Sequence, residues 1–324
     1  MLQKKRVILV MAITLGIFGI FSLTEQSQAS EALKKLRVAY IPVLDCLQLF
    51  VAKEKGFFKD VGLEIESRAV PSGPVIQTLL EAGEMDIGWS AVMPTSMGRS
   101  KGFDFQFVAT GAFDRKGHKF QKIFIKKESP YKSIKDVGGC TIAVNGIGSI
   151  SHLGFLTVAD SFGLDLSKLR IIEIPFPQME AALKEERVDV AAIVEPFATT
   201  TLISDVGRII YEGYFPAEAG DLMVASWIAK KAWVEKNLDL AKRFIGAINR
   251  ATDSINHNPE ELPEIIMKNT KLSIDLAKKL TLPAFTVELK KAEIQVTINM
   301  MVKYGFLKTP LDVRDVVSDL LPMK

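Results

Sequence analysis

From residue 36 onward the chain alternates short apolar runs with longer amphipathic stretches, and this alternation limits the possible folds more than any other feature. The apolar runs predict strands at 36–41, 62–70, 86–89, 105–110, 122–127, 141–144, 169–174, 188–194 and 223–229. The amphipathic stretches predict helices at 44–55, 73–82, 149–162, 178–186 and 196–203. Such alternation is typical of α/β proteins with parallel layers.

The order of the predicted elements indicates two lobes. The strand at 122–127 is expected to carry the chain into a second α/β lobe, and the strand at 223–229 to return it to the first. The predicted boundaries are 30–119 and 229–324 for lobe 1, and 120–228 for lobe 2. Residues 231–319 are predicted to form a helical C-terminal tail, with helices at 239–256, 259–269, 274–280 and 291–304. Two crossing segments would form a hinge, with a ligand between the lobes.

The N-terminus has the pattern of an export signal. Basic residues at 4–6 precede an uncharged apolar run at 7–23, and small residues follow at 27 and 29, the positions that a signal peptidase reads. We therefore predict that residues 1–29 are a cleaved signal peptide and that the mature protein is periplasmic. A retained membrane anchor is the alternative, because the apolar run is slightly long for a signal core. No Cys precedes Cys46, so acylation at the cleavage site is not expected.

Charge and cysteine content exclude other classes of protein. Removing residues 1–29 takes three Lys or Arg and one Glu from totals of 41 and 38, which leaves a nearly neutral chain. A nucleic-acid partner is not expected, because binding one needs a clustered basic face. The two cysteines, Cys46 and Cys140, are predicted to lie in different lobes. We expect no disulfide between them, because it would lock the hinge.

Several motifs carry a more specific resemblance. They are Arg37-Val-Ala-Tyr-Ile-Pro42 and the segments 49–58, 61–66, 81–88 and 188–196. In this order they resemble the nitrate, sulfonate, taurine and thiamine-precursor binding proteins, the SsuA/THI5-like or NMT1-like group, over nearly the whole mature chain. The resemblance implies a type II periplasmic-binding-protein fold without catalytic activity or cofactor. It also implies a monomer that captures a small solute and delivers it to an ABC permease in the inner membrane.

In open α/β sheets the ligand crevice lies beyond the carboxyl ends of the strands. This rule nominates residues 42–47, 71–73, 89–94, 110–113 and 146–152, together with the end of the strand at 188–194. The candidate ligand-binding residues are Asp45, Cys46, Ser72, Gly73, Trp89, Ser90, Gly111, Ser149, Ser151, His152, Glu195 and Phe197.

The segment 146–152 follows a predicted strand and opens a helix, so its free N–H groups favour an anionic or strongly polar ligand group. The resemblance points the same way, since sulfonate and taurine binders carry a Gly-Ser-Thr-Ser-His-like segment here. This chain has Ile150 where the family often has Thr. The alternative is that Ser149 is only a helix N-cap.

The other candidates also have two interpretations each. Asp45 with Gln48 has the spacing of a capping box, but its carboxylate could instead face a ligand amine or ring N–H. Glu195 either belongs to the first turn of a helix before Pro196 or points toward the cleft. Trp89 and Phe197 either stack on a flat ligand or belong to the core.

The nominated loops lack a cluster of Lys or Arg; only Arg115, Lys116 and Lys119 come near. A bare anion such as nitrate would need cationic donors, whereas acids with aromatics suit a nitrogen heterocycle or a zwitterion better. His152 has no partner at metal-ligand spacing, so no metal site is expected.

Two rival functions stay open. A sensory ligand-binding module would retain the apolar N-terminus as an anchor. An enzyme similar to the eukaryotic thiamine-pyrimidine synthase, which binds pyridoxal phosphate, would carry a cysteine-rich segment, and this chain has only two scattered Cys. It also has no P-loop, zinc-protease helix or nucleophile elbow.

Overall fold

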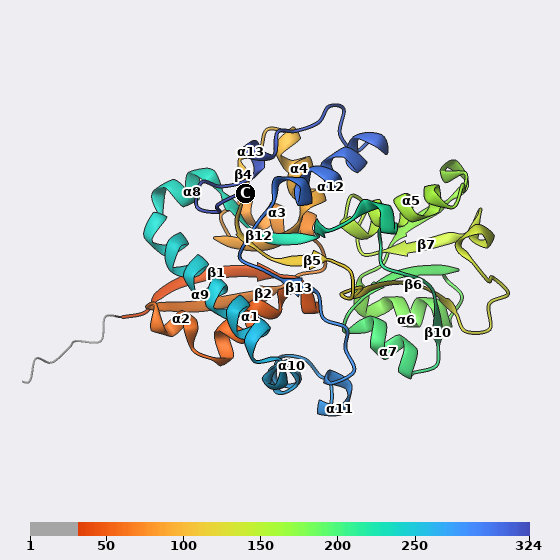
Figure 1. The fold of residues 1–324 in the computed structure, drawn as a ribbon, viewed down its shortest axis with the longest axis horizontal. Coiled ribbons are helices and arrows are strands. Elements are labelled where there is room, and N and C mark those ends of the chain that lie inside the picture. The colour runs from red at the N-terminus through yellow and green to blue at the C-terminus, as the bar shows by residue number, and fades with distance from the viewer. Residues whose placement is uncertain (1–31) are drawn as a thin grey trace, which may run out of the picture. The chain divides into compact units, whose positions relative to one another are not determined.

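The computed structural model describes residues 32–324, so the predicted signal peptide lies outside the described residues. Leu33–Lys324 form one compact unit. Its strands form two five-stranded sheets and one three-stranded sheet (Figure 1). Each five-stranded sheet with its flanking helices is called a lobe below. Within residues 32–324, no helix is both long and apolar enough to cross a membrane.

Lobe 1 is built on a sheet with the strand order β2-β1-β3-β12-β4. Strand β1 pairs in parallel with β2 and β3, whereas β12 runs antiparallel to β3 and β4. The central strand β3 is buried along its whole length, because helices pack on it. The strands are β1 Lys34–Tyr40, β2 Leu63–Ala69, β3 Ile87–Ala91, β4 Phe105–Thr110 and β12 Ala225–Lys230. The helices are α1 Leu47–Glu54, α2 Phe57–Asp60, α3 Gly73–Glu81 and α4 Val92–Ser100.

Lobe 2 repeats the same plan with the order β10-β6-β9-β7-β8. Strand β7 is parallel to β8 and β9, and β6 is antiparallel to β9 with Gln121 opposite Val194. The start of β6 therefore lies beside the end of β9. The strands are β6 Gln121–Lys126, β7 Thr141–Val144, β8 Arg170–Glu173, β9 Val190–Val194 and β10 Gly207–Glu212. The helices are α5 Ile150–Ser161, α6 Phe176–Lys184 and α7 Phe197–Ile203.

The crossing segments meet at the three-stranded sheet β11-β5-β13. Strand β5 (Ala112–Asp114) precedes the first crossing, β11 (Leu222–Met223) ends the second, and β13 (Ala284–Phe285) belongs to the tail. The predicted boundary between residues 228 and 229 is placed too late, because it falls inside β12, which already pairs with β3 and β4. The chain leaves lobe 2 after β10, through residues 213–221.

The tail is largely helical, as predicted, and it packs mainly on lobe 1. Phe244 of α9 stacks on Phe58 at 5.6 Å between ring centroids and meets Trp227 edge-to-face at 5.4 Å. Helix α12 contacts both α4 of lobe 1 and α5 of lobe 2. The tail helices are α8 Lys231–Lys236, α9 Leu238–His257, α10 Leu262–Asn269, α11 Ile274–Ala277, α12 Lys291–Lys303 and α13 Val313–Val316. Short 3-10 turns occur at Leu44–Cys46 (η1), Ile134–Val137, Leu166–Lys168, Ala217–Ala219 and Pro259–Glu261.

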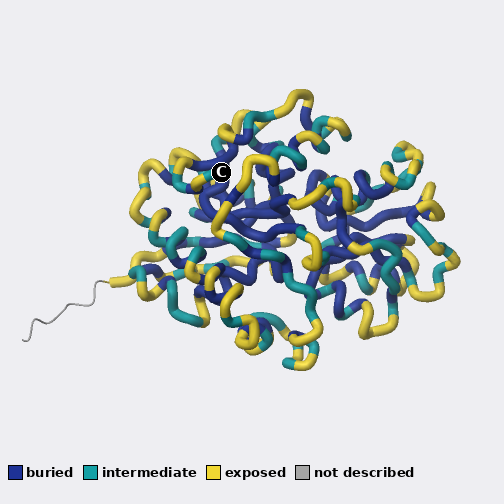
Figure 2. Tube along the Cα trace, viewed as in Figure 1, coloured by how far each residue is buried: buried dark blue, intermediate teal, exposed yellow. Residues whose placement is uncertain are grey.

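Helix α4 and strand β10 are absent from the sequence-based prediction. Helix α4 contains Pro94, Gly98 and three Ser or Thr residues, all poor helix formers. It forms because most of it is buried between the sheet and the tail, as the dark segments of Figure 2 illustrate for the core as a whole. Gly98 permits the close packing, since a Cβ there would lie 2.8 Å from Cδ2 of Phe105.

Candidate functional site

An enclosed space lies between the two lobes, at the carboxyl ends of their parallel strands. Its volume is about 30 Å³. At roughly 10–15 Å³ per water, it has room for about two water molecules. Both lobes contribute to its lining, which consists of Ile41, Val43, Asp45, Gly73, Trp89, Ala91, Pro94, Gln121, Asn145, Ser149, Ile150, Phe176 and Val194.

Asp45 is the ionisable side chain of this lining. It lies in η1, directly after β1, and is only 3% exposed. Its Oδ1 has no hydrogen-bond partner among the described residues, and burial raises the pKa of the carboxyl to about 7. The backbone N–H of Leu44 donates to the carbonyl of Glu195 at 3.1 Å, which holds η1 against lobe 2.

The capping box expected between Asp45 and Gln48 does not form. The Gln48 amide donates to Thr252 Oγ1 at 2.6 Å and accepts from Trp227 Nε1 at 2.9 Å. Both partners are far away in the sequence and draw Gln48 into the core of lobe 1. Helix α1 begins at Leu47 with Cys46 at its N-cap position, so the carboxyl of Asp45 does not cap it and lines the enclosed space.

Two further buried polar side chains face this space without partners in the described part of the chain. Trp89 is 3% exposed and its Nε1–H donates to nothing; Gln121 is 1% exposed and neither amide atom is paired. Trp89 lies in the middle of β3 and not at its carboxyl end as expected, because the strand continues to Ala91. Gln121 was missed, because it opens a strand instead of ending one. It reaches the site since β6 runs antiparallel to β9.

Asn145 and Ser149 form the polar wall on lobe 2. Ser151 Oγ donates to Asn145 Oδ1 at 2.8 Å and lies 2.9 Å from Ser149 Oγ. Asn145 Nδ2 also reaches the carbonyl of Pro71 in lobe 1 at 3.5 Å. Ser149 caps α5 by accepting from the N–H of His152, so it caps the helix and lines the space at once. Ser151 holds these two side chains in place from behind.

Several candidates lie close by but do not line the space. Cys46 Sγ donates to the carbonyl of Ile41 at 3.2 Å, and Cys46 and Cys140 are both buried free thiols. Ser72 is the N-cap position of α3, and Ser90 Oγ accepts from Thr95 Oγ1 at 3.3 Å. Gly111 is needed for packing, since a Cβ there would lie 2.3 Å from the carbonyl oxygen of Ala225.

His152 and Glu195 are used in contacts between lobe 2 and the tail. The ring of His152 meets Phe306 edge-to-face at 5.1 Å, and burial lowers its pKa. Glu195 is fully buried and accepts from Thr199 N at 3.0 Å, Thr199 Oγ1 at 2.9 Å and Thr281 N at 3.3 Å. Glu195 thus caps the first turn of α7, and burial raises its pKa. Phe197 lines an apolar groove beside the enclosed space.

Comparison with known proteins identifies the family. The sequence pattern described as NMT1/THI5-like matches residues 44–262, more than half of the chain. The chain belongs to the NMT1/THI5-like family. A relative from Brucella abortus, whose name provisionally calls it a binding protein, is 25% identical over 82% of this chain and 84% of its own length. The taurine-binding periplasmic protein of Escherichia coli is 24% identical over 67% of this chain and 66% of its length.

Solved structures confirm the predicted fold of this NMT1/THI5-like chain. The ligand-binding component of an ABC-type import system from Staphylococcus aureus superposes with a TM-score of 0.76. The match covers 89% of this chain and 97% of that one at 15% identity, which shows a shared periplasmic-binding-protein fold.

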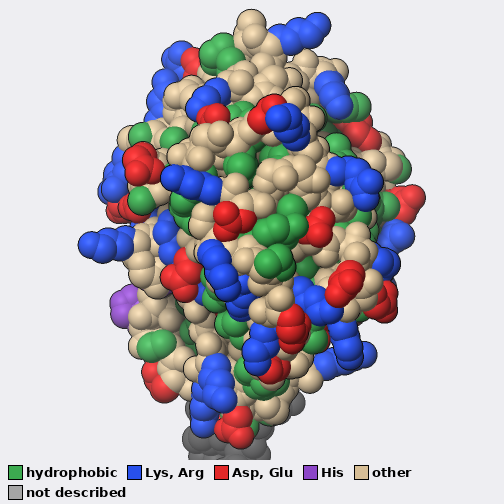
Figure 3. Space-filling model, turned by 90° about the vertical axis from the view of Figure 1, so that its right-hand side faces the viewer, with side chains coloured by type: hydrophobic (Ala, Val, Ile, Leu, Met, Phe, Trp, Pro, Cys, Tyr) green, Lys and Arg blue, Asp and Glu red, His purple; other side chains and the backbone are tan. Residues whose placement is uncertain are grey.

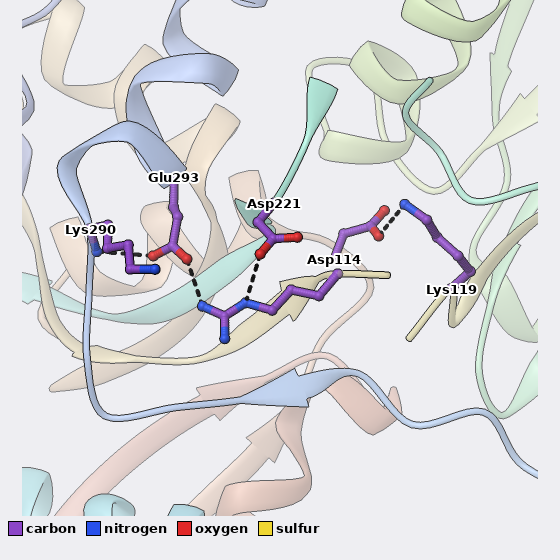
Figure 4. A network of polar contacts seen from close by, with 6 residues as sticks. Asp114, Lys119, Asp221, Lys290 and Glu293 are labelled. Carbon is purple, nitrogen blue, oxygen red and sulfur yellow. Dashed lines mark hydrogen bonds and ion pairs between the residues drawn. The ribbon is translucent and has the colours of Figure 1, made fainter. Parts of the chain in front are cut away.

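The lining of the enclosed space carries an acidic side chain, Asp45, without a basic side chain beside it in the described chain. Among the described residues that line it, none is Lys, Arg or His. Arg115 and Lys119, which come near in the sequence, pair with Glu293 and Asp114 in the hinge, each at 2.6 Å (Figure 4). Within residues 32–324, no three His, Cys, Asp or Glu side chains gather as a metal site would require. On the face shown in Figure 3, basic and acidic side chains are interspersed.

Proposed function

We propose that this chain is the substrate-binding component of an ABC importer, exported to the periplasm, where as a monomer it delivers a small organic solute to an inner-membrane permease. Family membership and the names of the relatives support this role in general. The observation that carries it is the set of buried, unpaired polar groups on Asp45, Trp89 and Gln121 between the lobes. Such groups are costly to bury, and a bound solute would pair them.

The same groups specify the chemistry of the solute. The Asp45 carboxylate calls for an N–H donor, the Trp89 indole N–H for an acceptor, and the Gln121 amide can supply either. A bare anion would bring negative charge next to Asp45 without a cation in the lining. We therefore favour an amino-substituted nitrogen heterocycle, such as a thiamine pyrimidine precursor, over nitrate, and over taurine, whose sulfonate would have no cation in the lining.

Capture requires the lobes to move. A space of about 30 Å³ cannot hold such a solute, so the lobes must separate to admit it and close again around it. Closure with the matching solute pairs Asp45, Trp89 and Gln121, whereas a solute that lacks the N–H leaves Asp45 buried and unpaired. Selectivity then comes from the closed state.

A thermal-shift screen tests this proposal. The chain from residue 30 contains the whole compact unit; it would be unfolded, refolded and screened against aminopyrimidines, flavins, amines, taurine, alkanesulfonates and nitrate. A solute at about 100 times its Kd stabilises the fold by about 2.7 kcal/mol. We expect a hit among N–H-donating heterocycles that is lost in Asp45→Asn and kept in Asp253→Asn, a carboxylate exposed on α9.

Two results would count against the proposal. A shift with taurine or nitrate that survives Asp45→Asn would refute the solute chemistry. The absence of any shift from well-folded protein would favour the sensory role, which N-terminal sequencing of the exported form would then examine.

A further inference from the structure

An apolar groove adjoins the enclosed polar space. Its volume is about 220 Å³. Ile41, Val43 and Phe176 line both, so the two compartments share a wall. The complete lining of the groove is Ile41, Pro42, Val43, Ala69, Val70, Pro71, Pro175, Phe176, Pro177 and Phe197.

The walls of this groove offer few hydrogen bonds. All of its side chains are apolar, and its four prolines also lack a backbone N–H donor. The rings of Phe176 and Phe197 lie stacked, with centroids 6.4 Å apart and planes 16° from parallel. Pro42, Pro71 and Pro177 are nevertheless exposed to solvent. The groove is therefore open to solvent on one side.

The groove takes its walls from both lobes. Residues 41–43 and 69–71 follow strands β1 and β2 of lobe 1, whereas Pro175–Pro177 and Phe197 stand at the starts of α6 and α7 in lobe 2. Its width therefore depends on closure of the lobes, and an occupant that touches both walls stabilises the closed form. Because the groove and the enclosed space share a wall, a solute that binds at Asp45 can extend into the groove.

We propose that the solute has two parts: a polar head with an N–H donor that faces Asp45, and an apolar extension of several carbon atoms that lies in the groove. This inference rests on the proposed function and adds a second determinant of specificity. Compact polar solutes would contact Asp45 between the closing lobes without reaching into the groove. A solute with the extension would bind more tightly, by about fourfold for each buried methylene group.

Alkylamidines provide the test, because the amidinium head donates N–H to a carboxylate and its single substituent can point only away from it. Titration calorimetry would compare acetamidine with its longer homologues up to hexanamidine. We expect the affinity to rise by about fourfold per methylene in the unmodified protein. Phe197→Ala should flatten this rise, because the longer chains lose an aromatic wall of the groove. The matched control is Phe103→Ala, an exposed ring just before β4, at the opposite end of the sheet from the site.

The outcomes separate the two proposals. Asp45-dependent binding of acetamidine with no gain for longer chains would overturn the groove inference and leave the proposed function standing; the groove would then be free for a partner protein. A gain that persists in Phe197→Ala would also overturn it. If neither an amidine nor any N–H-donating heterocycle of the thermal-shift screen binds, the head-group chemistry of the proposed function fails, and this inference fails with it.

Discussion

At the scale of single residues, Asp45 is the main determinant of the proposed solute binding. A buried carboxylate oxygen without a hydrogen-bond donor, such as Asp45 Oδ1, is unfavourable in the closed protein, and the side chains of Trp89 and Gln121 are unpaired as well within residues 32–324. The Ser151 hydroxyl, by contrast, is hydrogen-bonded to the side chains of Asn145 and Ser149, so its role is to position these two residues. The unpaired groups are those that a solute can satisfy.

The raised pKa of Asp45 predicts how binding depends on pH. Burial raises this pKa to about 7, and an N–H donor binds the ionised form and lowers the pKa in the complex. The affinity for acetamidine, which stays protonated, should be full above about pH 7 and fall by up to tenfold per unit below it. Calorimetric titrations across this range measure the effect, and Asp45→Asn should bind weakly at every pH. Affinity that rises on acidification would mean that the protonated carboxyl is the binding form.

At the scale of elements, helix α12 of the tail links the lobes. It packs on α4, and Lys303 Nζ and Tyr304 OH donate to Asp160 Oδ2 of α5 at 2.6 and 2.8 Å. The hydrogen bond from Lys303 is the main reason that the pKa of Asp160 is lowered. This contact therefore stabilises the closed form at neutral pH and weakens only as the pH falls below the ordinary carboxyl range.

Breaking the α5–α12 contact should speed release of the solute. Asp160→Asn removes a partly exposed ion pair, which is typically worth about 0.2–1 kcal/mol, so koff should rise by about 1.4-fold to fivefold. Stopped-flow measurement of dissociation gives the rate. Asp165→Asn is the control, since its carboxylate binds Ser167 within lobe 2. Equal rates in the two variants would show that the contact persists when the lobes open.

At the scale of the whole molecule, an ionic network joins the two crossings and the tail (Figure 4). Arg115 of the first crossing lies 2.6 Å from Glu293 of α12 and 3.8 Å from Asp221 of the second crossing. The Glu293 side chain is only 4% exposed and also accepts from Lys290 N at 2.9 Å. The hinge is thus held by three segments that are distant in sequence.

Arg115→Met should destabilise the whole unit, because it leaves the buried Glu293 carboxylate without its cation. We expect the free energy of unfolding to fall by about 1–3 kcal/mol, measured by urea denaturation. Arg250→Met, which removes an exposed pair with Asp60, should cost less than about 1 kcal/mol. Equal losses in the two variants would show that the hinge network contributes no more to the free energy of unfolding than an exposed ion pair does.

Local pattern was enough to predict most strands and helices, the two-lobed fold and its family. Apolar periodicity is a property of neighbouring residues, and the rule for carboxyl ends of strands correctly brought Asp45, Gly73, Trp89 and Ser149 to the lining of one space. Whether these residues bind the solute stays a prediction.

Other features depended on contacts between residues far apart in the chain. Gln121 lines the space because β6 runs antiparallel to β9, and a sequence pattern does not reveal strand direction. Helix α4 forms because it is buried, against its own propensity. Asp45 does not cap the helix because α1 begins only at Leu47, with Cys46 at its N-cap position, and the Gln48 amide binds Thr252 and Trp227 instead. The sequence by itself thus determined the elements and the edge of the sheets where a ligand would bind. Only the tertiary structure decided which polar groups meet there without partners, because hydrogen-bond pairing depends on distance in space.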